Sequence, residues 1–315
     1  MKKDYNFIGK KFVFFGISLA IILIGIVCNF IFGTNLDIQF KGGSILTYSF
    51  TGQVDDSELK SVIQEATPEN QVSFTITQDI ITSGEEDSYK ISIQFSGEEA
   101  ITPDTQQLVT DTLTEKFPDN NFKYDETTSV EPSMGVNFLL KCLTAVAIAS
   151  VLMVLYVTIR FRKIGGFSAG VFALVALLHD VLMIYFFYVI FQKSIDSNFM
   201  AVVLMIIGYS LNDTIVVYDR VREERTLAGN KSNIVDVFNH SASRVMSRTI
   251  STSITTLAAI AVVYIVAVIY GLESVQSFAL PMMVGIVSGC YSSLCIAGPL
   301  WVWYLTSKKE KKAKK

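Results

Sequence analysis

The sequence predicts an integral membrane protein: a bundle of six transmembrane helices with a ferredoxin-like α+β (βαββαβ) extracytoplasmic domain between helices one and two. Half of the 315 residues are apolar, mean hydropathy is +0.43, and only 17% of the residues are charged. Residues 33–131 contain 19 acidic residues against five lysines, a net charge of −14, whereas the remainder carries a net charge of +11. Such asymmetry indicates that two parts of the chain lie in different compartments.

Six apolar segments are long enough to cross the roughly 30 Å hydrocarbon core of a bilayer, which takes about 20 helical residues. The predicted spans are Phe12–Phe32, Val136–Ile159, Phe167–Phe191, Phe199–Tyr218, Ile250–Tyr270 and Phe278–Leu305. The first is too long for the apolar core of a secretory signal and no small-residue cleavage site follows it, so we expect an uncleaved helix.

Lysine and arginine residues gather at the two termini, in the turn after helix two and between helices four and five. The positive-inside rule therefore predicts that both termini of this multi-pass protein are cytoplasmic. The predicted divisions are residues 1–32 (N-terminus and helix one), 33–132 (extracytoplasmic domain), 133–219 (helices two to four), 220–248 (cytoplasmic loop with an amphipathic helix), 249–306 (helices five and six) and 307–315 (basic cytoplasmic tail).

Patterning within residues 33–132 predicts a βαββαβ order, which is that of a split ferredoxin-like unit. The predicted strands and helices are Ile45–Phe50, Asp55–Ala66, Val72–Thr77, Tyr89–Phe95, Thr102–Phe117 and Asn121–Thr127. Asp55 or Asp56 is placed to cap the first helix, and Thr102 with Pro103 the second. The segment Gly84–Asp87 is predicted to form the hairpin connection between the strands Val72–Thr77 and Tyr89–Phe95.

Apolar residues between Ile234 and Val245 recur at helical spacing and predict an amphipathic helix in the cytoplasmic loop. The four cysteines lie in apolar stretches without ligand spacing, so we interpret them as fillers of the membrane helices. No nucleotide-binding loop or hydrolase motif occurs, and we expect no hydrolytic activity, metal or cofactor and no nucleic-acid partner.

Helix four carries the most distinctive ionisable residue, Asp213, about two turns inside the cytoplasmic edge. A charge at this depth costs upwards of about 2.5 kcal/mol, so it indicates function by default. Tyr209 lies one turn away, Ser210 adds a donor, and Asn212 and Thr214 are expected to bond to neighbouring helices. Asp213 is either a carboxylate that exchanges a proton within a relay or a structural carboxylate hydrogen-bonded within the bundle.

His179 and Asp180 form a second candidate pair near the middle of helix three. Adjacent residues on a helix point about 100° apart, so the two side chains need not meet. His179 is more often a packing residue than a proton carrier in such a setting, although imidazole titrates near neutrality. Asp180 remains open to either interpretation.

Arg248 is expected at the start of helix five, followed by hydroxyl residues that include Thr252 and suit interhelical hydrogen bonds. Arg248 is either a cytoplasmic anchor or a counter-ion to Asp213. A cation that approaches a buried carboxylate favours its ionised form while burial disfavours it, so helix movement could switch protonation.

Four segments resemble motifs of the SecF family, the smaller half of the SecD/SecF group in the resistance-nodulation-division superfamily. The first is DIQFKGG, which contains Asp37, Phe40, Lys41, Gly42 and Gly43, and its glycine pair predicts a flexible join. The second is GYSLNDTIVVYDR, which runs from Gly208 to Arg220. Leu178 to Asp180 and Ser247 to Ser253 match two more motifs.

The resemblance implies a location in a bacterial cell (inner) membrane. It also implies a subunit that pairs with SecD in a twelve-helix unit, associates with the SecYEG channel and often with YajC and YidC, and assists export of a preprotein. Protons are implied as the coupling ion, with the helix-four carboxylate and helix-five guanidinium, Asp213 and Arg248 here, in their path. Two alternatives stay open: a non-conducting scaffold subunit of the translocase, and half of a small-molecule proton antiporter.

Overall fold

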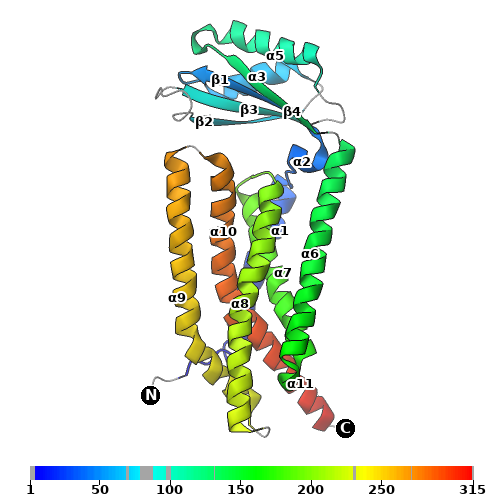
Figure 1. Cartoon of the computed structure of the whole chain (residues 1–315), viewed down its shortest axis with the longest axis vertical. Helices are drawn as coiled ribbons and strands as arrows, with labels where there is room; N and C mark the ends of the chain where they lie inside the picture. Colours follow the sequence, from blue (N-terminus) through cyan, green and yellow to red (C-terminus); the bar gives the residue numbers. More distant parts are fainter. Residues whose placement is uncertain are drawn as a thin grey trace.

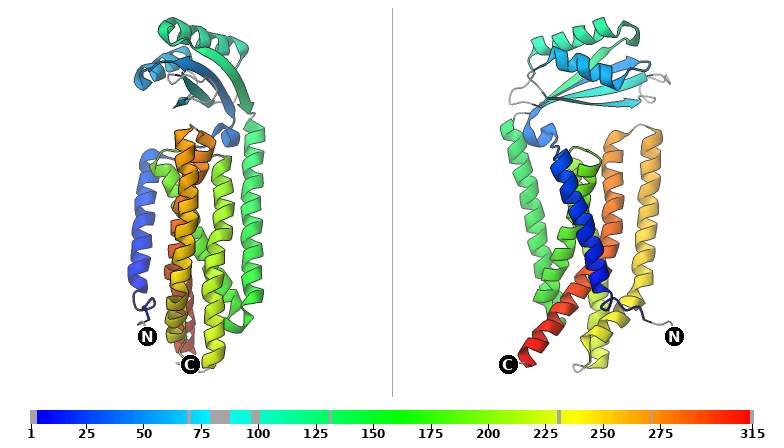
Figure 2. Two further views of the ribbon diagram at one scale, coloured as in Figure 1. Left: turned by 60° about the vertical axis from the view of Figure 1, so that its left-hand side comes forward. Right: turned by 180° about the vertical axis from the view of Figure 1, so that it is seen from behind.

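The computed structural model describes residues 4–68, 71–78, 88–96, 101–130, 132–229, 232–270 and 272–313. Long helices form a bundle, and a small sheet domain covers one end of it (Figure 1). Both ends of the chain lie at the opposite end of the bundle (Figure 2). The two layers are joined by a short helix, α2 (Ile38–Lys41), and by the start of α6.

Within the described residues, six helical spans are long and apolar enough to cross a membrane, and they fit the predicted membrane helical bundle. Five of them are single helices: α1 (Lys11–Phe32), α6 (Pro132–Arg160), α7 (Gly166–Ile190), α8 (Ser197–Ala228) and α9 (Ile234–Ile269). The sixth consists of α10 (Glu273–Ser292), a π-helical turn η3 (Ser293–Ala297) and α11 (Gly298–Ala313).

The segment between the fourth and fifth spans differs from the prediction of a loop with a separate amphipathic helix. Helix α8 continues to Ala228, and α9 begins at Ile234, where the Asn233 side chain accepts a hydrogen bond from the Val235 N–H (3.1 Å). No Gly or Pro interrupts the chain between Ile234 and Ile269, and the apolar face that includes Phe238 stays buried. The amphipathic segment is therefore the first part of the fifth span, and Arg248 lies within that helix rather than at its start.

The sixth span bends where the sequence predicts one continuous helix. Pro299 lacks the N–H that would donate to the Cys295 carbonyl, and the π turn immediately before it absorbs the mismatch. Gly298 lies at the bend, where an added Cβ would collide with the Phe238 ring. The bend thus brings α11 against the first part of α9.

The sheet domain has the element order β-α-β-β-α-β. Its elements are β1 (Gly43–Thr51), α3 (Asp56–Ala66), β2 (Gln71–Gln78), β3 (Ser88–Ser96), α5 (Pro103–Lys116) and β4 (Lys123–Val130). The strands form one antiparallel sheet in the order β2-β3-β1-β4, with Leu46 opposite Ile93 and Thr127. Both helices cover the face of the sheet turned away from the bundle (Figure 1). The predicted hairpin Gly84–Asp87 lies outside the described residues.

Helix capping in this domain follows the sequence closely. The Asp55 carboxylate accepts hydrogen bonds from the N–H groups of Ser57 (2.8 Å) and Glu58 (3.1 Å), and these bonds lower the pKa of Asp55. The Thr102 hydroxyl accepts a hydrogen bond from the Thr105 N–H, with Pro103 at the first helical position. Both predicted helix starts are confirmed because capping is a local property of the chain.

The core of the sheet domain should be sensitive to truncation. Leu113 on α5 is fully buried, whereas Leu108 on the same helix is 50% exposed. We expect Leu113→Ala to destabilise the domain by about 2–5 kcal/mol, and Leu108→Ala to change its stability by less than about 0.5 kcal/mol. Hydrogen exchange of the β1 amides in the detergent-solubilised full chain measures the difference. Equal protection in the two variants would contradict the assigned core.

Candidate functional site

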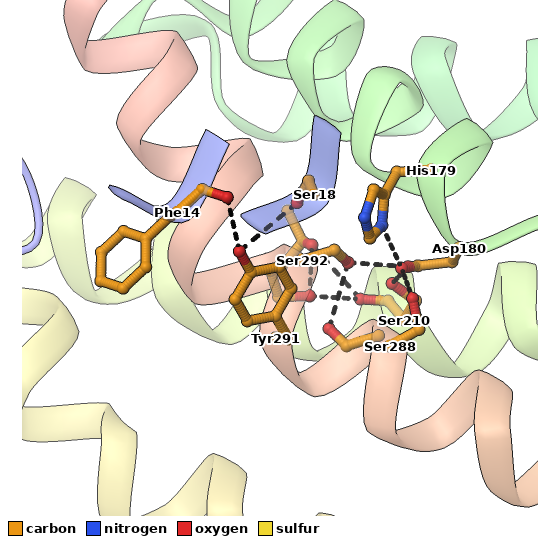
Figure 3. A network of polar contacts seen from close by, with 11 residues as sticks. Phe14, Ser18, His179, Asp180, Ser210, Ser288, Tyr291 and Ser292 are labelled. Atoms are coloured by element: carbon orange, nitrogen blue, oxygen red, sulfur yellow. Dashed lines mark hydrogen bonds and ion pairs between the residues drawn. The ribbon is translucent and has the colours of Figure 1, made fainter. Parts of the chain in front are cut away.

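A fully buried carboxylate, Asp180, lies at the centre of a polar cluster between α7, α8 and the sixth span (Figure 3). Three hydroxyls donate to it: Ser210 on α8 (2.6 Å to Oδ2), Ser288 (2.6 Å to Oδ1) and Ser292 (2.7 Å to Oδ2), both on α10. Donors to a carboxylate form stronger hydrogen bonds than neutral pairs do. The cluster therefore joins three helices at one point inside the bundle.

Close packing of α10 on α8 makes this cluster possible. A Cβ added to Gly289 would lie 3.0 Å from the Cβ and 3.2 Å from the Oγ of Ser210. At Gly285, one turn earlier, an added Cβ would lie 2.5 Å from Cγ1 of Ile206. Small residues let two helix backbones approach, which brings side chains as short as serine within reach of Asp180.

A second layer of hydroxyls connects the cluster to the π turn. The Ser293 hydroxyl donates to the Ser210 carbonyl (3.1 Å) and lies 2.9 Å from the Thr214 hydroxyl. Thr214 also bonds to the Ser210 carbonyl (3.2 Å). As predicted, Thr214 therefore bonds to a neighbouring helical element, and the bend in the sixth span is anchored to α8.

His179 contacts Asp180 although their positions in sequence did not require it. The imidazole Nδ1 lies 3.2 Å from Asp180 Oδ1, and Nε2 is buried without a hydrogen-bond partner among the described residues. The nearby Tyr291 hydroxyl donates to the Phe14 carbonyl (2.7 Å) and accepts from Ser18 (3.4 Å), as Figure 3 shows. These bonds attach α1 to the sixth span next to the cluster.

Asp213 lies on α8, one turn after Ser210, and its environment differs from that of Asp180. It is 4% exposed, and its Oδ2 is buried without any hydrogen-bond partner among the described residues. Arg248 on α9 and Cys290 on α10 lie within electrostatic range of the carboxylate. In the described chain no ion pair within 4.0 Å joins Asp213 to Arg248, so the carboxylate faces its cation across a gap.

The remaining polar residues of this region lie around Asp213 without binding it. The Tyr209 hydroxyl donates to Ser253 on α9 (3.4 Å). Thr252 donates to carbonyl oxygens of its own helix, at Arg248 (3.0 Å) and Thr249 (2.9 Å). Asn212 is exposed and, in the part of the chain that the structure describes, bonds to no neighbouring helix, which contradicts the expectation for this residue.

Both predicted carboxylates, Asp180 and Asp213, thus lie close to α10, but each has different neighbours there. Asp180 meets Ser288 and Ser292, while Asp213 faces Cys290 and Arg248. The serines of the sixth span, Ser288 and Ser292, were not identified from the sequence as partners of Asp180. Gly285, Ser288, Gly289 and Ser292 recur at helical spacing on one face, and that pattern of small residues could have indicated a packing surface.

The residues of the DIQFKGG motif form a packed elbow rather than the predicted flexible join. Asp37 caps α2 by accepting from the Gln39 N–H (3.0 Å), and its second oxygen accepts from Gln94 of β3 (3.2 Å). Phe40 is buried and stacks on Phe138 of α6, with ring centroids 5.6 Å apart. The elbow therefore contacts both the sheet and the bundle.

The two glycines of the elbow are required by its backbone. Gly42 and Gly43 have φ of +83° and +137°, and a Cβ on Gly43 would collide with the Phe95 carbonyl oxygen. Partial burial lowers the pKa of Lys41, and the neighbouring Asp37 carboxylate opposes that shift. Tight packing at Gly43 connects the orientation of β1 to that of α2.

Among the described residues, no group of three or more His, Cys, Asp and Glu side chains could hold a metal ion. The two carboxylates described above are instead single groups, Asp180 surrounded by hydroxyls and Asp213 facing a cation. Such an arrangement can gain, lose or hold a proton, and it can fix the relative positions of helices.

Comparison with known proteins matches residues 109–307 to the model of the family described as protein export membrane protein SecD/SecF, C-terminal. A protein translocase subunit SecF of Petrotoga mobilis is 33% identical over 309 residues, covering 98% of each chain. A protein translocase subunit SecDF of Bacillus subtilis is 30% identical over 300 residues, which are 95% of this chain and 38% of that protein.

Two solved structures of SecDF have a similar fold. A structure of SecDF from Thermus thermophilus, described as a translocon-associated membrane protein, gives a TM-score of 0.78 at 24% identity over 97% of this chain. A super-membrane-facing form of SecDF gives 0.69 at 25% identity over the whole chain. The chain spans about 40% of the length of these structures.

The packing of Gly289 against Ser210 leads to a test of the site's architecture. We expect Gly289→Leu to separate α10 from α8, break the hydrogen bonds to Asp180 and cost about 1–3 kcal/mol of stability. The control is Gly208→Leu on α8, where an added Cβ meets nothing within 4 Å. Thermal unfolding of the full chain in detergent measures both, and a larger loss for Gly208→Leu would refute the proposed packing.

Proposed function

The chain belongs to the SecD/SecF family of protein-export membrane proteins, and from this premise we propose that it is a proton-coupled SecF-type subunit of a bacterial protein translocase. The observation that carries the proposal is the buried Asp213 carboxylate, which has a cation within electrostatic range and an oxygen without a hydrogen-bond partner among the described residues. A carboxylate in this state has two protonation states whose relative free energies depend on the position of Arg248.

The proposed mechanism uses the opposing effects of burial and charge. When Arg248 approaches, the ionised carboxylate is favoured and Asp213 releases its proton. When α9 moves away, the uncompensated charge is costly in the bilayer and Asp213 takes up a proton. In one arrangement Asp213 would exchange its proton with one side of the membrane, and in the other arrangement with the opposite side. Proton flow would then be coupled to movement of α9 relative to α8.

The contacts favour a different role for Asp180. Its oxygens already accept three hydroxyl hydrogen bonds and lie beside His179. These bonds join the Asp180 side chain on α7 to α8 and α10. We propose that Asp180 and His179 hold the helices in register around the path, whereas Asp213 exchanges the proton.

The sheet domain is proposed to be an extracytoplasmic ferredoxin-like unit. The sheet order and two helices on one face support the fold, and the acidic charge of residues 33–131 supports its exclusion from the cytoplasm. Both termini would then lie in the cytoplasm of a cell whose inner membrane the protein spans. The cations at that end of the bundle support this orientation.

The proposed partner is SecD. The Bacillus subtilis relative is named as a single SecDF subunit, and this chain corresponds to 38% of it. Association with the SecYEG channel, with YajC and YidC, and with a translocating preprotein is proposed on the same family relationship. The sheet domain, on its short elbow, would be the part that engages a preprotein outside the membrane.

Two other functions compete with this one. A non-conducting scaffold would need no unpartnered buried carboxylate, so Asp213 favours the proton-coupled subunit. Half of a small-molecule antiporter would need a substrate pocket in its outer part, and the outer part here is one small domain that packs around its own core. Variants of Asp213 and Arg248 distinguish the non-conducting scaffold from the proton-coupled subunit.

Replacement of the two charged partners tests proton coupling. We expect Asp213→Asn to abolish proton flux and reduce preprotein export while the complex still assembles, and Arg248→Met to alter the pH dependence of export. The matched control is Asp219→Asn on the same helix, whose half-exposed carboxylate pairs with Arg160 (3.1 Å). Export and proton uptake by vesicles that contain the assembled complex are the measurements. Normal export by Asp213→Asn, at wild-type complex levels, would leave only the scaffold.

Accessibility to a membrane-impermeant thiol reagent tests the orientation. In a background with the four native cysteines replaced by serine, we expect Ser57→Cys on α3 to react from outside intact cells. Thr226→Cys at the other end of the bundle should react only after the membrane is opened. Both positions are exposed in the structure. The reverse pattern of labelling would invert the proposed topology.

A further inference from the structure

A pocket lies at the end of the bundle opposite the sheet domain. It is a cavity of about 270 Å³ between η2 (Arg162–Ile164) and parts of α8, α9 and α11. Its rim carries the cations Lys163, Arg225 and Lys308, and no acidic residue lies among its described lining residues. The three cations come from three separate helical elements, so the fold itself brings them together.

Among the residues that the structure describes, these three cations form no ion pair, whereas two arginines on the same stretch of α8 do. Arg220 and Arg222 form ion pairs with Glu223, Glu224 and Asp219 on the same stretch of α8. Within the described residues, Lys163 and Arg225 have no ion-pair partner, and Lys308 has only the Tyr304 ring, 5.7 Å away. Three cations around one cavity repel one another, so an anion bound among them would relieve that repulsion.

The floor of the cavity is apolar. Ile164 and Ile234 are buried there, and Leu305 is half-buried. On α11, one turn before Lys308, Trp303 and Tyr304 are each 42% exposed. Exposed aromatic side chains beside cations are typical of the boundary between lipid and water. The cavity therefore combines apolar and cationic surfaces at the depth where phospholipid headgroups lie.

We propose that this cavity binds one anionic phospholipid. The phosphate would contact Lys163, Arg225 and Lys308, and the upper acyl chain would cover Leu305 and the apolar floor. Basic pockets between transmembrane helices on the cytoplasmic side bind lipid headgroups in this way. The bound lipid would lie between the three like-charged side chains that the turn after α6, the end of α8 and the end of α11 bring to the cavity.

Titration of the delipidated full chain in detergent tests the proposal. Phosphatidylglycerol is added in mixed micelles, with phosphatidylcholine as the neutral comparison, and bound lipid is counted by native mass spectrometry. The test variant is Lys163→Gln, Arg225→Gln, Lys308→Gln. We expect affinity for phosphatidylglycerol to fall about 100-fold, since each cation near the surface contributes about fivefold. Replacing Lys163 and Lys308 by arginine should preserve binding.

The control carries the same loss of charge outside the cavity: Lys10→Gln, Lys11→Gln, Arg244→Gln. It should bind phosphatidylglycerol as the unaltered chain does. Equal affinity of the test and control variants would overturn the proposal, as would equal binding of phosphatidylcholine. Displacement of the lipid by inorganic phosphate or glycerol phosphate at millimolar concentration would also overturn it, because the site would then recognise a free phosphate.

Discussion

The hydrogen bonds to Asp180 are the interactions on which the arrangement of the bundle depends. A carboxylate in the hydrocarbon core must be compensated, and here the compensation comes from hydroxyls on two other helices. Serine is short, so these bonds form only if α8 and α10 approach closely, which Gly285 and Gly289 permit. The polar cluster and the small residues therefore specify one register of three helices, and that register also determines where Asp213 lies.

The two intramembrane carboxylates show how partners decide the role of a residue type. Asp180 and Asp213 are both almost completely buried. Asp180 accepts three hydroxyl hydrogen bonds, whereas Asp213 has a cation within electrostatic range and an oxygen that finds no hydrogen-bond partner in the part of the chain that the structure describes. A satisfied carboxylate stabilises one arrangement of helices, while an unsatisfied one changes its protonation when its surroundings move. The contrast supports the proposal that Asp180 is a structural centre and that Asp213 exchanges a proton.

The two ends of the bundle are specialised in different ways. At one end, the elbow around Phe40 and Gly43 packs the sheet domain onto α6 and α2, so movements of the helices can be transmitted to the domain. At the other end, unpaired cations surround an apolar cavity at the level of exposed Trp303 and Tyr304. A lipid bound there would stabilise the ends of helices that the bundle leaves under mutual repulsion.

Local properties of the chain could be predicted from the sequence. Hydropathy located the spans because each helix satisfies its own backbone in lipid, and Asp55 and Thr102 cap helices through bonds within a few residues. Asp213 and Asp180 were identified because an acid inside a span is costly wherever it packs. The tertiary structure alone decided which of them is satisfied, since Ser288 and Ser292 lie about a hundred residues away and reach Asp180 only after the helices pack. It also decided that α9 is continuous through Arg248 and that Gly42 and Gly43 form a rigid elbow, because burial against distant residues outweighs local pattern at both places.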